Sequence, residues 1–297
     1  MPHGFVSLKT DSQEINRMNI CKTISEFRQY RHSAAGKVIF VPTMGALHEG
    51  HGSLVRMARR LAGPDGIVAA SIFVNPTQFG PHEDFHKYPR PFEQDLANLT
   101  AWGADVVFSP SPEEMYGPGN AISIDPGELG TVLDGAIRPG HFRGVCTVVA
   151  KLLGIVEPAA MILGQKDFQQ QLILKHMVRD LNIPVEIITA PTLREPDGLA
   201  MSSRNRYLSP DQRSRAASIY QALSWATDQY KSGMRDAAAL VAGMSEHLRQ
   251  AGLEVQYALP CHAETLEVYP KAVGAPCVFL IAAKLGTTRL IDNVVNS

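Results

Sequence analysis

The stretch "VIFVPTMGALHEGH", residues 38–51, decides how the rest of the sequence is interpreted. An apolar run that is typical of a buried strand meets Pro42 and then Gly45, and a helical pattern begins at about residues 49–53. A strand that passes through a glycine-containing turn into a helix is the building unit of a parallel α/β sheet. Such a helix start presents unpaired backbone N–H groups, which favour a bound phosphate.

His48 and His51 lie three positions apart in this turn. This spacing puts both imidazoles on one face, where they can donate to the same anion. A zinc pair on a helix is expected at a spacing of four, as in HExxH, and no third ligand is evident, so a metal role is disfavoured. Two surface histidines in an ordinary turn are the alternative that this segment alone leaves open.

Apolar runs alternate with helical patterns through the first two-thirds of the sequence. Continuous apolar strands separated by helices predict a parallel sheet covered on both faces, which is a doubly wound, Rossmann-like α/β fold. The predicted strands are 37–42, 66–74, 104–110, 159–164 and 184–191. The predicted helices are 52–62, 92–103, 145–156 and 168–181. Ligands of such sheets bind at the carboxyl ends of the strands.

The pattern changes after about residue 192. A long helical region spans 209–252, and its opening "SPD" is typical of an N-cap with proline at the first helical position. Strand patterns follow at 253–260, 276–286 and 288–294. We expect two domains: a Rossmann-like domain over 1–192, of which 1–17 is a loose extension, and a smaller C-terminal α+β domain over 193–297.

Composition excludes several classes of protein. The chain has 297 residues, of which 45% are hydrophobic, so it can bury a large core. A formal net charge of −1 supplies no general attraction for nucleic acid or an anionic membrane, and a small anionic ligand suits it better. No apolar stretch approaches the ~18 residues of a membrane span. Four cysteines without a CxxC pair predict neither a zinc knot nor a disulfide framework, which favours the cytoplasm.

Two further strand ends carry polar residues. Asn75 and Gln78 follow the second strand, and neutral amides suit a small polar substrate, although this segment alone favours an ordinary Asn-Pro turn that ends the strand. Lys166 and Asp167 follow Gly164. The lysine offers a point charge for a phosphate, and the aspartate could hold a ribose hydroxyl or a metal. This segment alone favours a solvated helix start.

Two loops carry cationic residues. Arg138, His141 and Arg143 precede an apolar helix, and we interpret them as the decoration of a surface loop rather than a substrate entrance. Residues 202–204 supply two serines and an arginine, which can neutralise charge on phosphoryl oxygens or simply form a hydroxyl-rich linker. A hydrolase is disfavoured because no GxSxG elbow is present.

Five segments in this order, "PTMGALHEGH", "FVNPTQF", "GQKDFQQ", "REPDGLAMSSRN" and "GTTRLIDN", resemble the pantothenate synthetase family. This family is similar to class I aminoacyl-tRNA synthetases and forms adenylates with an HxGH motif. The resemblance runs from about residue 18 to 293 and implies the ATP-dependent ligation of (R)-pantoate and β-alanine to pantothenate. It implies a pantoyl-adenylate intermediate, AMP and pyrophosphate as products, Mg²⁺ with the ATP, and a homodimer without nucleic-acid or membrane partners.

The resemblance also implies roles for individual residues. The residues that it implies contact ATP are Met44, Gly45, Ala46, Leu47, His48, Glu49, Gly50, His51, Gly164, Gln165, Lys166, Asp167, Leu193, Met201, Ser202, Ser203 and Arg204. The residues that it implies contact pantoate or β-alanine are Pro42, Met44, Asn75, Gln78 and Gln170. The implied catalytic residues are His48, His51, Lys166, Ser202, Ser203 and Arg204, with the 201–204 loop as a lid. Asp95 matches a position associated with magnesium.

Three positions depart from the family pattern. Gln165 stands where glutamate is usual, Phe168 where tyrosine is usual, and Leu193 where valine is usual. None of them removes a group that the chemistry requires. Phe168 has no phenol hydroxyl and cannot make its hydrogen bond, so no role can rest on a hydroxyl at this position.

Two other functions fit parts of this pattern. A related nucleotidyltransferase that transfers AMP to a phosphorylated precursor would need more cations than the neutral Gln78 and Gln170 supply. A catalytically silent binding protein on the same fold would not need the histidine pair, Lys166 and the Ser-Ser-Arg loop together.

Overall fold

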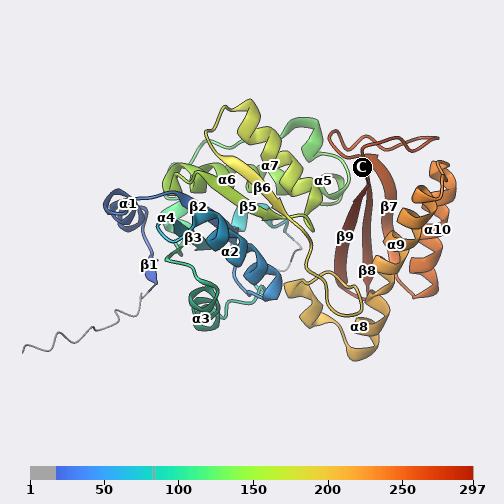
Figure 1. Cartoon of the computed structure of the whole chain (residues 1–297), viewed down its shortest axis with the longest axis horizontal. Coiled ribbons are helices and arrows are strands. Elements are labelled where there is room, and N and C mark those ends of the chain that lie inside the picture. Colours follow the sequence, from blue (N-terminus) through green and yellow to red (C-terminus); the bar gives the residue numbers. More distant parts are fainter. Residues whose placement is uncertain (1–17, 82, 84, 297) are drawn as a thin grey trace, which may run out of the picture.

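The protein, described here by a computed structural model, contains two sheets (Figure 1). The structure describes residues 18–296 except 82 and 84, so the expected loose extension 1–17 lies outside the described residues. The larger sheet has six parallel strands in the order β1-β4-β3-β2-β5-β6. The smaller sheet has three antiparallel strands in the order β7-β8-β9. The predicted fold class, a doubly wound parallel sheet with a smaller C-terminal α+β part, is confirmed.

The elements follow one another in strict alternation at first. The large sheet consists of β1 (Asn19–Cys21), β2 (Val38–Thr43), β3 (Ile67–Ile72), β4 (Val106–Phe108), β5 (Ala160–Gly164) and β6 (Glu186–Ala190). Its helices are α1 (Ile24–Ser33), α2 (Glu49–Ala62), α3 (Phe92–Trp102), α4 (Pro112–Met115), α5 (Asp134–Ile137), α6 (His141–Val156) and α7 (Phe168–Asp180). Short 3₁₀ turns are η1 (Pro76–Gln78) and η2 (Gly127–Gly130).

Helices cover both faces of the large sheet because alternate residues of each strand point to opposite sides. On β2, Val38 and Phe40 pack into one core cluster with residues of α1, α6 and α7. Ile39 and Val41 pack into a second cluster with residues of α2 and α3. The continuous apolar runs of the sequence thus arise from strands that are buried on both faces.

The long helical region predicted over 209–252 divides into α8 (Pro210–Ala216), α9 (Ser218–Lys231) and α10 (Ala237–Gln250). Ser209 caps α8 and Pro210 is its first residue, as predicted. Between α9 and α10, Gly233 adopts a left-handed φ of 98°, and Asp236 accepts from two N–H groups at the start of α10. A third 3₁₀ turn, η3 (Ser203–Tyr207), precedes α8.

The C-terminal sheet consists of β7 (Glu254–His262), β8 (Cys277–Leu285) and β9 (Thr288–Asn296), where three strands were predicted. One face packs on α9 and α10 through residues such as Phe279. The opposite face packs Val278 and Leu280 against Phe168 and Leu172 of α7. The buried ring of Phe168 therefore serves this apolar contact, and α7 lies between the two sheets (Figure 1).

The chain changes direction within the large sheet between β2 and β5, which are neighbours. From β2 the chain continues through β3 toward one edge, and from β5 it continues to β6 at the other edge. Such a switch point leaves a crevice at the carboxyl ends of the two strands, where ligands of doubly wound folds bind.

All four cysteines are buried and free. No helix in the described part of the chain has the length and apolar character that crossing a membrane requires.

Candidate active site

A cavity of about 250 Å³ opens where β2 and β5 end. Its lining includes the following residues expected from the sequence: Pro42, Met44, His48, Gly50, His51, Asn75, Gln78, Gly164, Lys166, Asp167, Gln170, Leu193, Met201, Ser202, Ser203 and Arg204. The expected residues that do not line it are Gly45, Ala46, Leu47, Glu49, Asp95 and Gln165. Segments far apart in the sequence thus meet at one site.

The histidine pair forms a reciprocal cap at the start of α2. Nδ1 of His48 accepts a hydrogen bond from the backbone N–H of Gly50 at 3.1 Å. Nδ1 of His51 accepts one from the backbone N–H of His48 at 3.3 Å. The two ring centroids lie 4.2 Å apart, and both rings line the cavity. Glu49 instead forms an exposed ion pair with Arg56 at 2.6 Å.

Both imidazoles are neutral near pH 7. Burial lowers the pKa of His48 to about 4 and that of His51 to about 3, and the positive charges of Lys166 and Arg206 act in the same direction. Because Nδ1 accepts from an N–H in both rings, the one proton of each neutral ring must sit on Nε2. Each ring therefore offers a single Nε2–H donor to an anion.

Asp95 of α3 supports the turn between β2 and α2. Gly45 and Ala46 have left-handed φ values of 78° and 51°, which turns successive N–H groups the same way. The two carboxylate oxygens of Asp95 accept from the N–H groups of Ala46 and Leu47, both at 2.8 Å. Asp95 is 1% exposed and does not line the cavity. In this structure its carboxylate therefore supports the turn, and the magnesium role that the resemblance implied for this position stays a prediction.

A chain of hydrogen bonds fixes the direction of the Gln78 amide. The backbone N–H of Thr77 and the hydroxyl of Tyr116 donate to Oδ1 of Asn75 at 3.3 and 2.8 Å. Nδ2 of Asn75 must then donate, and it does so to Oε1 of Gln78 at 3.1 Å. Nε2 of Gln78 is turned to Sδ of Met44, 2.9 Å away. Gln78 therefore presents an N–H donor to the cavity, which suits a carboxylate or hydroxyl oxygen.

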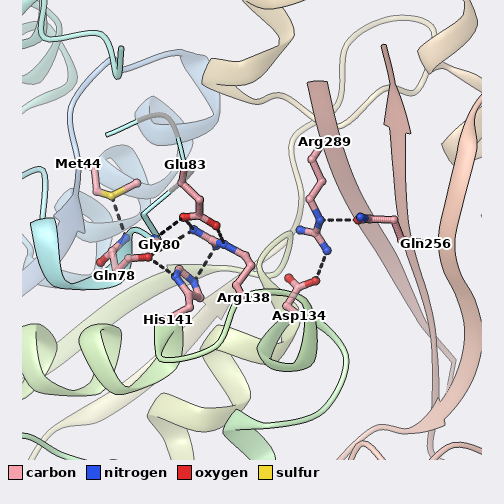
Figure 2. Close-up of polar contacts among 9 residues, drawn as sticks. All are labelled: Met44, Gln78, Gly80, Glu83, Asp134, Arg138, His141, Gln256 and Arg289. Atoms are coloured by element: carbon pink, nitrogen blue, oxygen red, sulfur yellow. Dashed lines mark hydrogen bonds and ion pairs between the residues drawn. The ribbon is translucent and has the colours of Figure 1, made fainter. Parts of the chain in front are cut away.

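Arg138 and His141 line the same cavity, so their interpretation as surface-loop decoration is wrong, whereas Arg143 is exposed. Figure 2 shows Arg138 between Glu83 and His141. The guanidinium donates to both oxygens of Glu83, at 2.5 and 2.7 Å, and to Nε2 of His141 at 3.0 Å. Nδ1–H of His141 then donates to the backbone carbonyl of Gln78 at 2.7 Å. Burial and the charge of Arg138 lower the pKa of His141 to about 4.

Lys166 and Asp167 follow β5 and form a pair at the cavity. Nζ of Lys166 lies 3.5 Å from Oδ1 of Asp167, and the side chains are 20% and 50% exposed. Burial would raise the pKa of Asp167, but Lys166 and Arg204 outweigh it and lower that pKa. Gln170 lines the cavity, whereas Gln169 is buried and accepts from the N–H of Asp134. A lysine ammonium is thus available to an anion at the end of β5.

The segment 191–202 connects β6 to η3, and the expected lid loop, 201–204, spans the end of this segment and the start of η3. The N–H of Met201 donates to the carbonyl of Leu193 at 3.0 Å. This bond closes the loop 193–201, and both of its end residues line the cavity. Oγ of Ser202 accepts from the N–H of Arg204 at 3.3 Å, so its hydroxyl proton is left to donate elsewhere.

Sequence reasoning did not single out Phe79, Tyr88 or Arg206, which lie at or beside the cavity. Phe79 and Tyr88 line it. Arg206 donates to the carbonyl of Leu47 at 3.3 Å and links η3 to the turn before α2. The only signal for Arg206 in the sequence was its position, two residues after Arg204.

A second cavity of about 740 Å³ shares Lys166 with the first and continues toward the C-terminal sheet.

No metal centre is formed by protein ligands within residues 18–296 outside the two omitted positions. No group of three or more His, Cys, Asp or Glu side chains among these residues is placed to hold a metal ion.

Comparisons with known proteins agree with this geometry. The family model of pantoate-beta-alanine ligase matches residues 19–295. A pantothenate synthetase 1 of Bradyrhizobium diazoefficiens is 46% identical, over 94% of this chain and 99% of that protein. A pantothenate synthetase structure from Thermus thermophilus has a TM-score of 0.87 and 42% identity, over 93% of this chain and 99% of that one.

A further structure is informative about ligands. The pantoate-beta-alanine ligase of Francisella tularensis, described as complexed with Beta-gamma ATP and Beta-alanine, has a TM-score of 0.78. It is 36% identical and covers 94% of this chain and 97% of that one. A family match over nearly the whole chain and relatives of this identity lead to one conclusion: the chain belongs to the pantoate–β-alanine ligase family.

Proposed function

We propose that this chain ligates (R)-pantoate and β-alanine to pantothenate at the expense of ATP, through pantoyl adenylate, with release of pyrophosphate and AMP. The observation that carries the proposal is the cavity at the β2–β5 switch point, where the histidine pair, Lys166 and Gln78 converge. Family membership and the ligands of the Francisella relative support it.

In the first step an oxygen of the pantoate carboxylate attacks the α-phosphorus of ATP. A new P–O bond forms, the bond from the α-phosphorus to the bridging oxygen breaks, and pyrophosphate leaves with that electron pair. No enzyme nucleophile is required, so the protein has to position the reactants and stabilise the shifting negative charge. Lys166 and the Nε2–H donors of His48 and His51 are suited to that task.

The reciprocal cap supports a specific division of labour between the two histidines. Each neutral ring has its Nδ1 lone pair engaged by a backbone N–H, so neither ring can take up a proton at Nδ1 without losing that bond. Both rings are therefore proposed to act as hydrogen-bond donors to the phosphates, with no proton transferred to the leaving group. Pyrophosphate needs no general acid to leave as an anion near pH 7.

In the second step the amine of β-alanine attacks the acyl carbon of the adenylate. The new C–N bond forms, the C–O bond to AMP breaks, and the amine loses a proton. Gln78, with its N–H turned into the cavity, is proposed to hold an oxygen of pantoate throughout. Because an acyl adenylate is prone to hydrolysis, the 201–204 loop and residues 193–297 are proposed to form a lid that excludes water.

Magnesium is proposed to arrive as part of the Mg–ATP complex. The described residues supply no set of three ligands, and both oxygens of Asp95 already accept backbone hydrogen bonds. Mg²⁺ commonly keeps several waters and binds phosphate oxygens, so a protein cage is not needed. The homodimer and the cytoplasmic location expected from the sequence remain predictions.

The proposal is tested by omission. Purified protein is incubated with Mg–ATP, pantoate and β-alanine, and AMP and pyrophosphate are measured with each acceptor left out in turn. Pyrophosphate release is expected to require pantoate, and AMP release in multiple turnovers is expected to require β-alanine as well. AMP release that ignores pantoate would contradict the proposal, and transfer of AMP to a phosphorylated acceptor would favour the related nucleotidyltransferases.

A further inference from the structure

Asn293 of β9 reaches from the C-terminal sheet to the loop that carries Lys166. Its Nδ2 donates to the backbone carbonyls of Gln165 and Lys166, both at 2.9 Å. Its Oδ1 accepts from Nε2 of Gln165 at 3.3 Å. Asn293 is 2% exposed. One buried side chain therefore holds two consecutive peptide units of the loop between β5 and α7.

Asn293 is itself fixed by its neighbours. Its N–H donates to Oδ1 of Asp292 at 2.8 Å. The carboxylate of Asp292 is 3% exposed and pairs with Arg194 at 2.5 and 3.1 Å. The guanidinium of Arg194 in turn lies over the ring of Tyr220, 4.0 Å from its centroid. A rigid support of this kind is what a positioning residue needs.

A second polar contact joins the C-terminal sheet to the large sheet at a different place. Arg289 donates to Asp134 at 2.5 Å and to Gln256 at 2.7 Å (Figure 2). The hydroxyl of Tyr257 also donates to Asp134, at 2.6 Å. Neither side of this contact belongs to the Lys166 loop. It can therefore separate general docking of the sheet from a direct effect on that loop.

We propose that Asn293 is a positioning residue for Lys166. The proposal rests on the proposed function, because it assumes that the ammonium of Lys166 acts on the phosphates of ATP. Lysine has a flexible stem, so the place of its ammonium depends on how firmly the backbone at its Cα is held. Two hydrogen bonds to the carbonyls of residues 165 and 166 hold that backbone from the opposite sheet.

The expected consequence is a loss of rate with little loss of pantoate binding. Asn293→Ala removes all three side-chain bonds, and Asn293→Leu removes them while keeping a branched side chain of similar shape. Each is expected to lower kcat for pantoate-dependent pyrophosphate release by ~10-fold or more, since small misplacements of a catalytic group are costly. The KM for pantoate should change by less than about threefold, because Gln78 and its supports are untouched.

Asn296→Ala is the matched control. Asn296 lies on the same strand, is 6% exposed, and its Nδ2 donates to the carbonyl of Val294 at 3.5 Å. It should retain the wild-type kcat within about threefold. Arg289→Gln weakens the other contact between the sheets and should likewise leave the Lys166 loop in place.

Hydrogen exchange over residues 164–168 decides the structural claim without reference to activity, because this window leaves out Gln169, which contacts Asp134. Exchange of this segment should be faster in Asn293→Ala and Asn293→Leu, and unchanged in Asn296→Ala and Arg289→Gln.

If both Asn293 variants fail to fold, Gln165→Ala is the substitute. It removes one of the three bonds from a half-buried position and should also speed exchange of this segment. Unchanged exchange in the folded variants that lose these bonds, or equal acceleration in the controls, would overturn the proposal. A wild-type protein without pantoate-dependent pyrophosphate release would overturn the proposed function instead, and the exchange result would stand.

Discussion

His48 and His51 owe their chemistry to a local backbone arrangement. The sequence indicates that the two rings share a face, because their spacing is close to one helical turn. It does not show which ring atom each one has free, because that depends on where α2 begins. With α2 starting at Glu49, each Nδ1 meets a backbone N–H, and only Nε2 is left to face a ligand.

His51→Ala and Lys166→Ala are each expected to lower the rate of pantoyl-adenylate formation by ~10²-fold or more, the scale of losing one donor that stabilises developing charge. Pantoate-dependent pyrophosphate release under single-turnover conditions measures this step. Lys231→Ala, at the exposed end of α9, serves as a control. Wild-type rates in either variant would remove that residue from the proposed machinery.

The free energy of unfolding should fall as the pH is lowered from 7 to 5. The folded-state pKa values of His48, His51 and His141, about 4, 3 and 4, lie below the unfolded value near 6.5. The unfolded state therefore binds more protons in this window, which costs up to about 2 kcal/mol of stability for each of these histidines. Urea unfolding at the two pH values measures the loss. His141→Gln should show a smaller loss, and an identical loss in variant and wild type would contradict the assignment.

At the scale of elements, η1 and α6 together place Gln78. The two elements pack closely at Gly144, where a β-carbon would lie 2.4 Å from the carbonyl oxygen of Thr77 and 2.8 Å from the N–H nitrogen of Gln78. The apolar pattern of the sequence predicted α6, although the helix begins four residues earlier, at His141. The same reasoning missed β1 and α1, because a three-residue edge strand shows no period and α1 buries only Phe27.

Gly144→Ala should push η1 away from α6. We expect a loss of ~1–3 kcal/mol of stability from overpacking, and a larger rise in KM for pantoate than for ATP. Gly154→Ala is the control in the same helix, since a β-carbon there meets nothing within 4 Å and alanine favours a helix by ~1 kcal/mol. Thermal unfolding and steady-state kinetics of both variants provide the comparison. Equal stability of the two would show that the close approach at Gly144 can relax.

At the scale of the whole molecule, the site depends on contacts between distant parts of the chain. Arg138 and His141 were placed in a surface loop because nothing local shows that this loop returns to Gln78, some 60 positions earlier. Arg206 and Asn293 were missed for the same reason, since each acts on a segment more than a hundred positions away. Periodicity predicts elements and their ends, whereas these contacts follow only from the folded arrangement.

The lid proposal predicts a ligand-dependent change in the segment 191–207. Binding of Mg–ATP with pantoate should slow hydrogen exchange there, because the Ser-Ser-Arg loop would gain contacts with the phosphates and lose contact with water. The edge strand β1, far from the cavity, should exchange equally with and without ligands and serves as the internal control. Identical exchange of the loop in both states would argue against a closing lid.

The most direct test of the whole account follows a single oxygen atom. If the pantoate carboxylate attacks the α-phosphorus, pantoate labelled with ¹⁸O in its carboxylate must leave one labelled oxygen on AMP when β-alanine displaces it. Mass spectrometry of the products with Mg–ATP and β-alanine measures this. We predict one ¹⁸O in each AMP and none in pyrophosphate. Unlabelled AMP, or label in pyrophosphate or inorganic phosphate, would contradict activation of pantoate as its adenylate.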